Sequence, residues 1–153
     1  MKLSVAACVI LAAVSTGCLG HPFQAPAPVE LHSARAPAEV VQIATQRLAA
    51  DGFTIPTQNA VYGVVVGSRV GTVSGLSGWI KCRFPSRAAA WNDAKSTLQV
   101  TVVADSARGG SNVSISAKVV TDYSALAAPY QRQTSVTDCV STGKTEAELK
   151  KLF

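Results

Sequence analysis

The sequence has few of the residues on which catalytic and metal sites depend. It contains two histidines, His21 and His32, and it has neither a Cys-x-x-Cys pair nor a Gly-x-Ser-x-Gly motif. Both histidines fall in a segment with several prolines, ahead of the predicted domain. A serine or cysteine nucleophile inside the domain would therefore have no anchored histidine base. We expect a protein without enzymatic activity, without a metal site and without a cofactor.

Charged and aromatic residues are also scarce, at 15% and 6% of the chain. The formal net charge of +5 is not concentrated in any basic run, so we expect no nucleic-acid partner. Small residues, valine, threonine and serine dominate the composition instead. This mixture favours a β-rich domain over a helical bundle, and 153 residues are enough for one domain.

The sequence lacks an apolar run long enough to cross a membrane, but it begins with a shorter one. Leu3–Val14 is about a dozen residues long, whereas a spanning helix needs about 20. Lys2 precedes this run, and the small residues Ser15–Gly17 separate it from Cys18, which is the pattern of a cleaved export signal. Residues 1–17 are therefore predicted to be a signal peptide.

This signal and Cys18 together resemble the lipobox of bacterial lipoproteins. The resemblance implies that a diacylglyceryl group is attached to the Cys18 thiol, that residues 1–17 are removed, and that the new amino group is acylated. Ser15 stands where the family usually has an aliphatic residue. The alternative interpretation is an ordinary cleaved signal peptide, after which Cys18 pairs or stays free.

The residue after Cys18 bears on the location that the lipobox implies. Leu19 stands in place of the aspartate that retains such lipoproteins at the inner membrane of enterobacteria. The resemblance therefore implies the periplasmic face of the outer membrane. The outer leaflet of the inner membrane and the soluble periplasm stay open as alternatives.

The cysteine count becomes informative once the signal peptide is removed. Cys8 leaves with the signal and Cys18 takes the lipid, so Cys82 and Cys139 remain as one pair. An exported protein reaches a compartment that permits disulfides. We predict a Cys82–Cys139 disulfide, with two reduced thiols in a metal or redox role as the alternative.

The chain after the signal is predicted to consist of a tether and one domain. Residues 18–36, the lipidated cysteine and the segment after it, contain Pro22, Pro26 and Pro28 and show no apolar period. Such a segment extends by about 3 Å per residue and can hold a domain up to roughly 50 Å from the lipid. The single domain is predicted over residues 37–153.

Helices are predicted at both ends of this domain. Pro37 suits the first position of a helix over residues 37–51, and Gly52 suits its C-terminal cap. The final helix is predicted to begin with a capping box over Thr145–Glu148, in which the threonine side chain caps the helix. The expected apolar stripes are Val40, Val41, Ile43, Ala44 and Leu48 in the first helix, and Leu149, Leu152 and Phe153 in the second.

Strands are predicted between these helices, over residues 60–70, 79–84, 97–105 and 112–122, with a short strand or extended arm over 134–140. The clearest hairpin joins 97–105 to 112–122, and Gly109 and Gly110 supply positive φ angles between them. Each of these two strands has one apolar and one polar face, which is typical of an antiparallel sheet with one face packed. The inward residues are expected to be Leu98, Val100, Val102 and Ala104, opposite Val113, Ile115, Ala117 and Val119.

The predicted fold class is α+β, with an N-terminal helix, an antiparallel sheet of three to four strands and a C-terminal helix. This order resembles the helix-grip domains of lipoproteins in the outer-membrane β-barrel assembly machinery. The resemblance covers residues 37–153 and rests on the order of elements and on the helix–glycine–phenylalanine–strand entry at Gly52–Phe53. It implies a scaffold or accessory role in an envelope protein complex.

One row of residues is a candidate binding surface. Strand alternation over residues 79–84 directs Trp79, Lys81 and Arg83 outward, with Arg87 and Trp91 nearby in sequence. Aromatic and cationic side chains together can bind a sugar, a lipid head group or an acidic protein. The alternative is that Trp79 packs beneath a loop and the cations are solvated.

The functional expectation is a lipid-anchored periplasmic accessory or scaffold lipoprotein of the bacterial envelope, with no enzymatic activity. Its partners would be the membrane, through the lipid anchor, and an envelope protein complex. The sequence does not indicate an oligomeric state. The alternative is a periplasmic module that binds a lipid or small ligand in an apolar cavity, lined by Val100, Val102, Ile115 and Val119.

Overall fold

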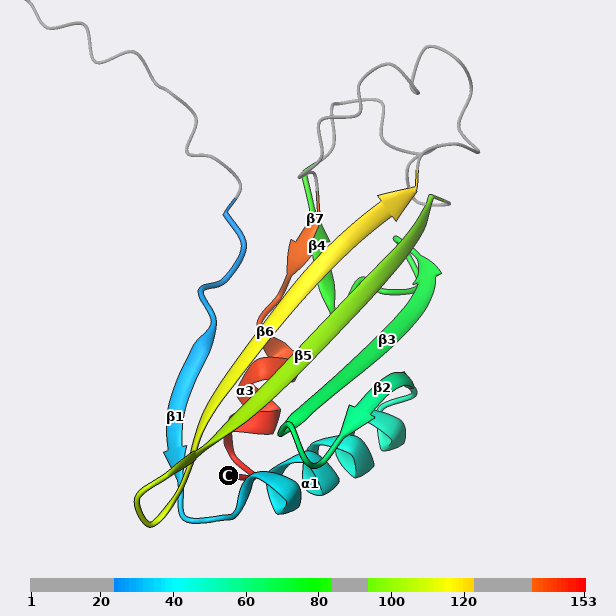
Figure 1. Cartoon of the computed structure of the whole chain (residues 1–153). Coiled ribbons are helices and arrows are strands. Elements are labelled where there is room, and N and C mark those ends of the chain that lie inside the picture. Colours follow the sequence, from blue (N-terminus) through cyan, green and yellow to red (C-terminus); the bar gives the residue numbers. More distant parts are fainter. Residues whose placement is uncertain (1–23, 84–93, 123–138) are drawn as a thin grey trace, which may run out of the picture.

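The computed structural model describes residues 24–83, 94–122 and 139–153, and it shows an α+β arrangement of two helices and two antiparallel sheets (Figure 1). The main sheet has five strands in the order β1-β6-β5-β3-β2, and β4 pairs with β7 in a separate two-stranded sheet. The elements are β1 (Val29–Ser33), α1 (Pro37–Ala50), β2 (Thr54–Asn59), β3 (Val64–Thr72), β4 (Ile80–Cys82), β5 (Lys95–Ala107), β6 (Gly110–Asp122), β7 (Cys139–Ser141) and α3 (Lys144–Lys150).

The long β5–β6 hairpin forms the centre of the main sheet, and its predicted alternation is confirmed. Leu98, Val100 and Val102 are fully buried, as is Ile115 opposite Val102. Both strands are longer than the sequence pattern suggested, because pairing continues to Ala107 and Gly110. Only Arg108 and Gly109 lie between that last pair, and Gly109 has a φ of 80° as the turn requires.

Helix α1 covers one face of this sheet, as its apolar stripe predicted. Pro37 occupies the first turn, and the buried side chains are Val40, Val41, Ala44 and Leu48. The helix ends with the N–H of Phe53 donating to Leu48 and that of Gly52 donating to Ala49, at 2.9 and 3.0 Å. This is a Schellman cap, and the φ of 78° at Gly52 is the conformation that it needs.

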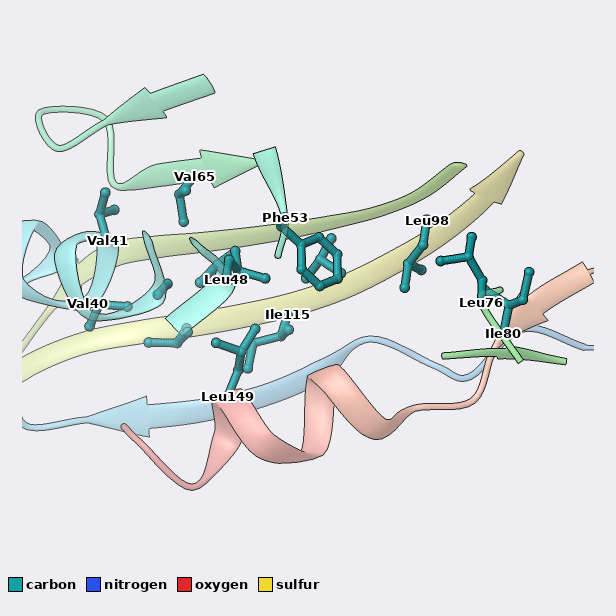
Figure 2. Close-up of a cluster of buried hydrophobic side chains, with 14 of the residues drawn as sticks. Val40, Val41, Leu48, Phe53, Val65, Leu76, Ile80, Leu98, Ile115 and Leu149 are labelled. Carbon is teal, nitrogen blue, oxygen red and sulfur yellow. The ribbon is translucent and has the colours of Figure 1, made fainter. Parts of the chain in front are cut away.

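The two helices enclose one core against the same face of the sheet. Helix α1 packs on β2, β3 and β5, whereas α3 packs on β6 and β1. Leu48 of α1 and Leu149 of α3 are both fully buried, and they belong to one cluster with Leu98 and Ile115 of the sheet (Figure 2). The cluster stabilises the fold because each buried aliphatic side chain contributes about 1.5–3 kcal/mol by leaving water.

The sheet has more strands than predicted, and β1 accounts for part of the difference. Residues 29–33 fall in the segment assigned to the tether, yet they pair antiparallel with β6 from Val29 opposite Ile115 to Ser33 opposite Ser111. Val29 and Leu31 pack against the core while Glu30 and His32 are exposed. This period-two pattern is short and flanked by prolines, which is why the tether prediction extended too far.

The strand predicted over residues 60–70 is divided differently in the structure. Residues 60–63 form the turn between β2 and β3, and the strand itself is shifted to Val64–Thr72. Asn59 organises the turn, because its Oδ1 accepts the N–H groups of Val61 and Tyr62 at 3.1 and 3.0 Å. Gly63 then turns the chain into β3 with a φ of 63°.

The capping box predicted for the last helix is wrong. The N-cap of α3 is Gly143, with a φ of 81°, and Thr145 lies inside the helix with 2% of its surface exposed. Ser141 supplies the polar contacts instead: its hydroxyl accepts the N–H of Gly143 and donates to the carboxylate of Glu146, both at 3.0 Å. The helix begins at Lys144, directly after the left-handed Gly143, so Thr145 is already its second residue and cannot act as its cap.

Candidate functional site

The predicted outward row does not form one exposed row in the structure. Lys81 and Arg83 are exposed, whereas Trp79 is half-buried and packs against the core. The Trp79 ring meets Phe53 edge-on, with ring centroids 5.8 Å apart and an interplanar angle of 82°. Two further residues of the predicted surface, Arg87 and Trp91, lie outside the described residues.

Two cations that the sequence analysis did not select lie over Trp79. The guanidinium carbon of Arg69 is 4.8 Å from the ring centroid, and the ammonium nitrogen of Lys144 is 4.7 Å from it. Both distances are within the range of cation–π attraction. The structure therefore replaces the predicted Trp79–Lys81–Arg83 row with a cluster of Arg69, Trp79 and Lys144, here called the Trp79 cluster.

The end of helix α1 fixes the position of Arg69. Its side chain projects from the inward face of β3 and donates a hydrogen bond to the main-chain oxygen of Asp51. That oxygen belongs to the last turn of the helix, where carbonyl groups lack intrahelical donors. A Cβ on Gly52 would lie 3.8 Å from the Arg69 guanidinium, which is ordinary van der Waals contact, so this position favours glycine for its φ of 78° and not for lack of space.

Backbone hydrogen bonds on both sides fix Trp79. Its N–H donates to the carbonyl of Leu76 at 2.8 Å. Its own carbonyl accepts the N–H of Thr142 at 2.9 Å and the Thr142 hydroxyl at 3.2 Å. Because Trp79 directly precedes β4 and Thr142 comes two residues before Lys144, these bonds join the turn that carries the ring to the start of the helix that carries one of the cations.

The neighbouring carboxylates belong to a different arginine. Arg47 of α1 contacts Asp51, the C-cap of the same helix, at 3.0 Å and Glu148 of α3 at 2.5 Å, so it links the two helices. The hydrogen bond that Arg47 donates to the Glu148 carboxylate and the negative charge of Asp51 raise the pKa of the Arg47 guanidinium above its ordinary value. In the part of the chain that the structure describes, no carboxylate forms an ion pair with Arg69 or Lys144.

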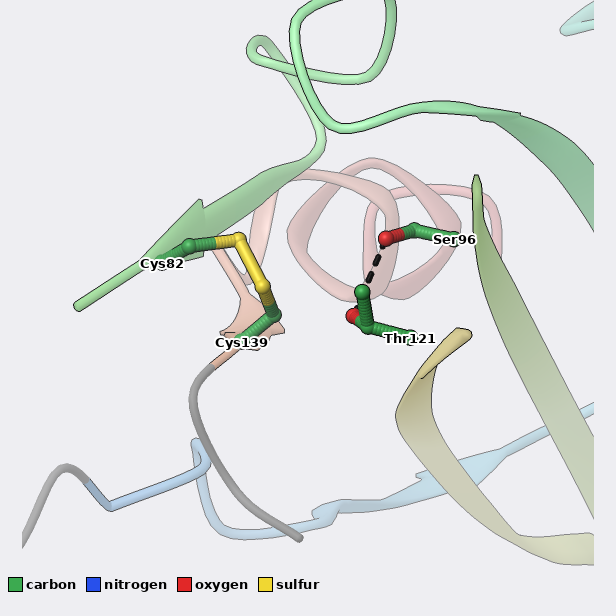
Figure 3. The surroundings of a disulfide bond; sticks show 4 residues. All are labelled: Cys82, Ser96, Thr121 and Cys139. Carbon is green, nitrogen blue, oxygen red and sulfur yellow. Dashed lines mark hydrogen bonds between the residues drawn. A yellow bond between two sulfur atoms is a disulfide. The ribbon is translucent and has the colours of Figure 1, made fainter. Parts of the chain in front are cut away.

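The predicted disulfide between Cys82 and Cys139 is confirmed. Cys82 of β4 and Cys139 of β7 are direct cross-strand partners and form a disulfide that spans 57 residues of sequence. Figure 3 shows this bond near Ser96 and Thr121, whose hydroxyl groups share a hydrogen bond of 2.9 Å. Cys18, the predicted lipidation site, lies outside the described residues.

The rest of the described chain offers neither a metal site nor a membrane span. No group of three or more histidine, cysteine, aspartate or glutamate side chains is placed to hold a metal ion within residues 24–83, 94–122 and 139–153. Among the helices described there, none is long and apolar enough to cross a bilayer. Comparison of the sequence with models of known families and with curated proteins gives no match.

Sequence reasoning missed both cations of the Trp79 cluster for different reasons. Arg69 lies four residues after the buried Val65, between Gly67 and Gly71, so strand alternation places its side chain on the same inward face. An arginine on an inward face is unusual, and this could have marked Arg69 as a candidate site residue. Lys144 carried no such signal. Its approach to Trp79 depends on the pairing of β4 with β7, which strand alternation alone does not reveal.

Proposed function

We propose that this chain is a lipid-anchored accessory or scaffold protein of the bacterial envelope, acylated at Cys18 and held at the periplasmic face of the outer membrane. The observation that carries the proposal is the N-terminal sequence: Lys2, the apolar run Leu3–Val14, and small residues directly before Cys18. The role is structural and not enzymatic, with an envelope protein complex as the partner.

The beginning of the folded part supports a short tether between lipid and domain. Residues 24–28 are exposed and belong to no helix or strand, and β1 starts at Val29. Ten residues then separate Cys18 from β1. At about 3 Å per residue they reach roughly 30 Å, so the domain would stay close to the membrane surface.

Two features of the domain also support the proposal. The Cys82–Cys139 disulfide fits an oxidising compartment such as the periplasm. Helix α1 packs across one face of an antiparallel sheet, which supports the helix-grip arrangement that the order of elements suggested. Of the residues named for a ligand cavity in the alternative, Val100, Val102 and Ile115 are fully buried in the core cluster, and Val119 is partly buried against it.

Fractionation of a Gram-negative host that expresses the full chain tests this proposal. We expect wild-type protein in the outer-membrane fraction and Cys18→Ser protein outside it, because the serine cannot take the thioether-linked lipid. Cys8→Ser is the matched control, since that cysteine lies in the segment to be removed, and it should fractionate as wild type. Identical fractionation of Cys18→Ser and wild type would overturn the anchor.

A further inference from the structure

We propose that the Trp79 cluster binds a phosphate group, with Arg69 and Lys144 as its two cationic contacts beside the Trp79 ring. This is a second property of the domain, independent of acylation at Cys18. It rests on how charge is distributed where α1, β3, β4 and α3 meet.

The first argument is that the carboxylates near the Trp79 cluster pair with other residues. The carboxylates of Asp51, at the C-terminal end of α1, and Glu148, in α3, both bind Arg47. Arg69 donates a hydrogen bond to the main-chain oxygen of Asp51, which carries no net charge. The Glu146 carboxylate accepts the hydroxyl of Ser141 and is buried, with 3% of the residue's surface exposed. The described residues thus leave two cations beside one ring and neutralise neither with a carboxylate.

The second argument is distance. Arg69 and Lys144 both lie within 5 Å of the Trp79 ring centroid, so their charges are within about 10 Å of each other. Two positive charges this close repel each other, and salt with a screening length of about 8 Å weakens that repulsion. An anion placed between them would relieve this repulsion. A phosphate has oxygen atoms on several sides and can accept hydrogen bonds from a guanidinium and an ammonium group together.

The third argument is that the cluster is held in place and open to solvent. The hydrogen bond to Asp51 positions Arg69, and the bonds to Leu76 and Thr142 position Trp79. Lys144 is exposed and Trp79 is half-buried, so a ligand can reach both from solvent. A cationic site that is already ordered loses little conformational entropy when its ligand binds.

The phosphate group could belong to a lipid head group or to a free ligand, and one experiment distinguishes the two. The sample is residues 18–153 carrying Cys18→Ser, so that no acyl chain contributes to vesicle binding. Trp91→Phe is added because the chain has two tryptophans, which leaves Trp79 as the single indole fluorophore. Trp79 fluorescence is then followed during titration with inorganic phosphate, with vesicles of phosphatidylcholine, and with vesicles that also contain phosphatidylglycerol.

We expect a saturable change in Trp79 fluorescence with inorganic phosphate, with phosphatidylglycerol vesicles, or with both. A response to the vesicles alone assigns the phosphate to a lipid head group, and a response to inorganic phosphate assigns it to a free ligand. Lys144→Gln should weaken the responding interaction about tenfold, because one charged hydrogen bond is lost. Lys150→Gln, the same change in the last turn of the same helix, should leave it unchanged.

Two results would overturn the inference. One is the absence of a response to both phosphate-containing titrants in a protein whose circular dichroism matches wild type. The other is equal binding by Lys144→Gln and Lys150→Gln, which would assign any response to general basic charge. Arg69→Gln gives a second, independent variant, and its melting temperature separates a lost contact from a lost fold.

Discussion

Gly63 occupies a position that accepts no side chain. A Cβ there would lie 1.9 Å from the carbonyl oxygen of Ala104, and the φ of 63° is strained for other residues. The close approach exists because the N–H of Ala104 donates to the carbonyl of Gly63 at 2.7 Å. The turn that carries Val61 and Tyr62 is therefore fixed by backbone contact with β5.

Gly63→Ala should lower the free energy of unfolding strongly. The left-handed φ alone costs about 1–2 kcal/mol, and displacement of the Ala104 carbonyl should add about 1–3 kcal/mol. Urea unfolding followed by circular dichroism measures the change. Gly109→Ala separates the two causes, because Gly109 has a φ of 80° but nothing within 4 Å of its Cβ position. Equal losses for both variants would contradict the steric argument.

Helix α1 depends on one fully buried leucine for its packing on the sheet. Leu48 is completely buried, and its side chain lies within 3.0 Å of where a Cβ on Gly67 would be. Leu48→Ala should therefore cost about 2–5 kcal/mol of unfolding free energy by leaving a cavity. Gln46→Ala is the control from the exposed face of the same helix and should change stability little. Comparable losses in the two variants would contradict the assigned face of α1.

The disulfide joins the small β4–β7 sheet across 57 residues of chain. In the chain-entropy model, closing a loop of that length stabilises the fold by about 4 kcal/mol. The variant with both Cys82→Ser and Cys139→Ser should unfold at a correspondingly lower urea concentration. Reductant should lower the wild-type midpoint toward that of the double variant and leave the variant itself unchanged. A wild-type midpoint that reductant does not shift would contradict the bond's contribution.

The elements that could be predicted from sequence are those whose signal is local. Helix α1 has its first-turn proline, its apolar stripe and its C-terminal glycine within 16 residues, and the β5–β6 hairpin has strict alternation around a glycine turn. Each of these signals involves neighbours in the chain. Both elements were therefore placed correctly, although the ends of the strands lay a few residues further out.

The elements that could not be predicted depend on contacts between distant residues. Strand β1 has only two inward aliphatic residues, Val29 and Leu31, and its strand character comes from pairing with β6, about 80 residues away. The start of α3 is set by Ser141 and Gly143, and no local rule distinguishes this from a cap at Thr145. The Trp79 cluster likewise joins three segments that are separate in sequence.

The arrangement of the domain gives the proposed anchor a direction. Strand β1 runs toward the β5–β6 turn, since its start at Val29 pairs with Ile115 in the middle of β6 and its end at Ser33 pairs with Ser111 beside the turn, and the C-terminus lies near the same turn (Figure 1). The hydroxyl of Ser33 donates to the main-chain oxygen of Phe153 at 3.2 Å, so the C-terminus is held there. Because the segment before β1 carries the proposed anchor, the β5–β6 turn and the C-terminus lie at the end of β1 that is farther from Cys18 along the chain.

The most direct test of the account is the intact mass of the full chain extracted from bacterial membranes, measured with and without reductant. The account predicts the mass of residues 18–153 plus a diacylglyceryl group and an N-linked acyl chain, rising by two hydrogens on reduction. Neither lipid addition should appear in Cys18→Ser. An unmodified mass beginning at or near Cys18, in wild-type protein from the soluble periplasm, would contradict the anchor and leave a freely diffusing domain.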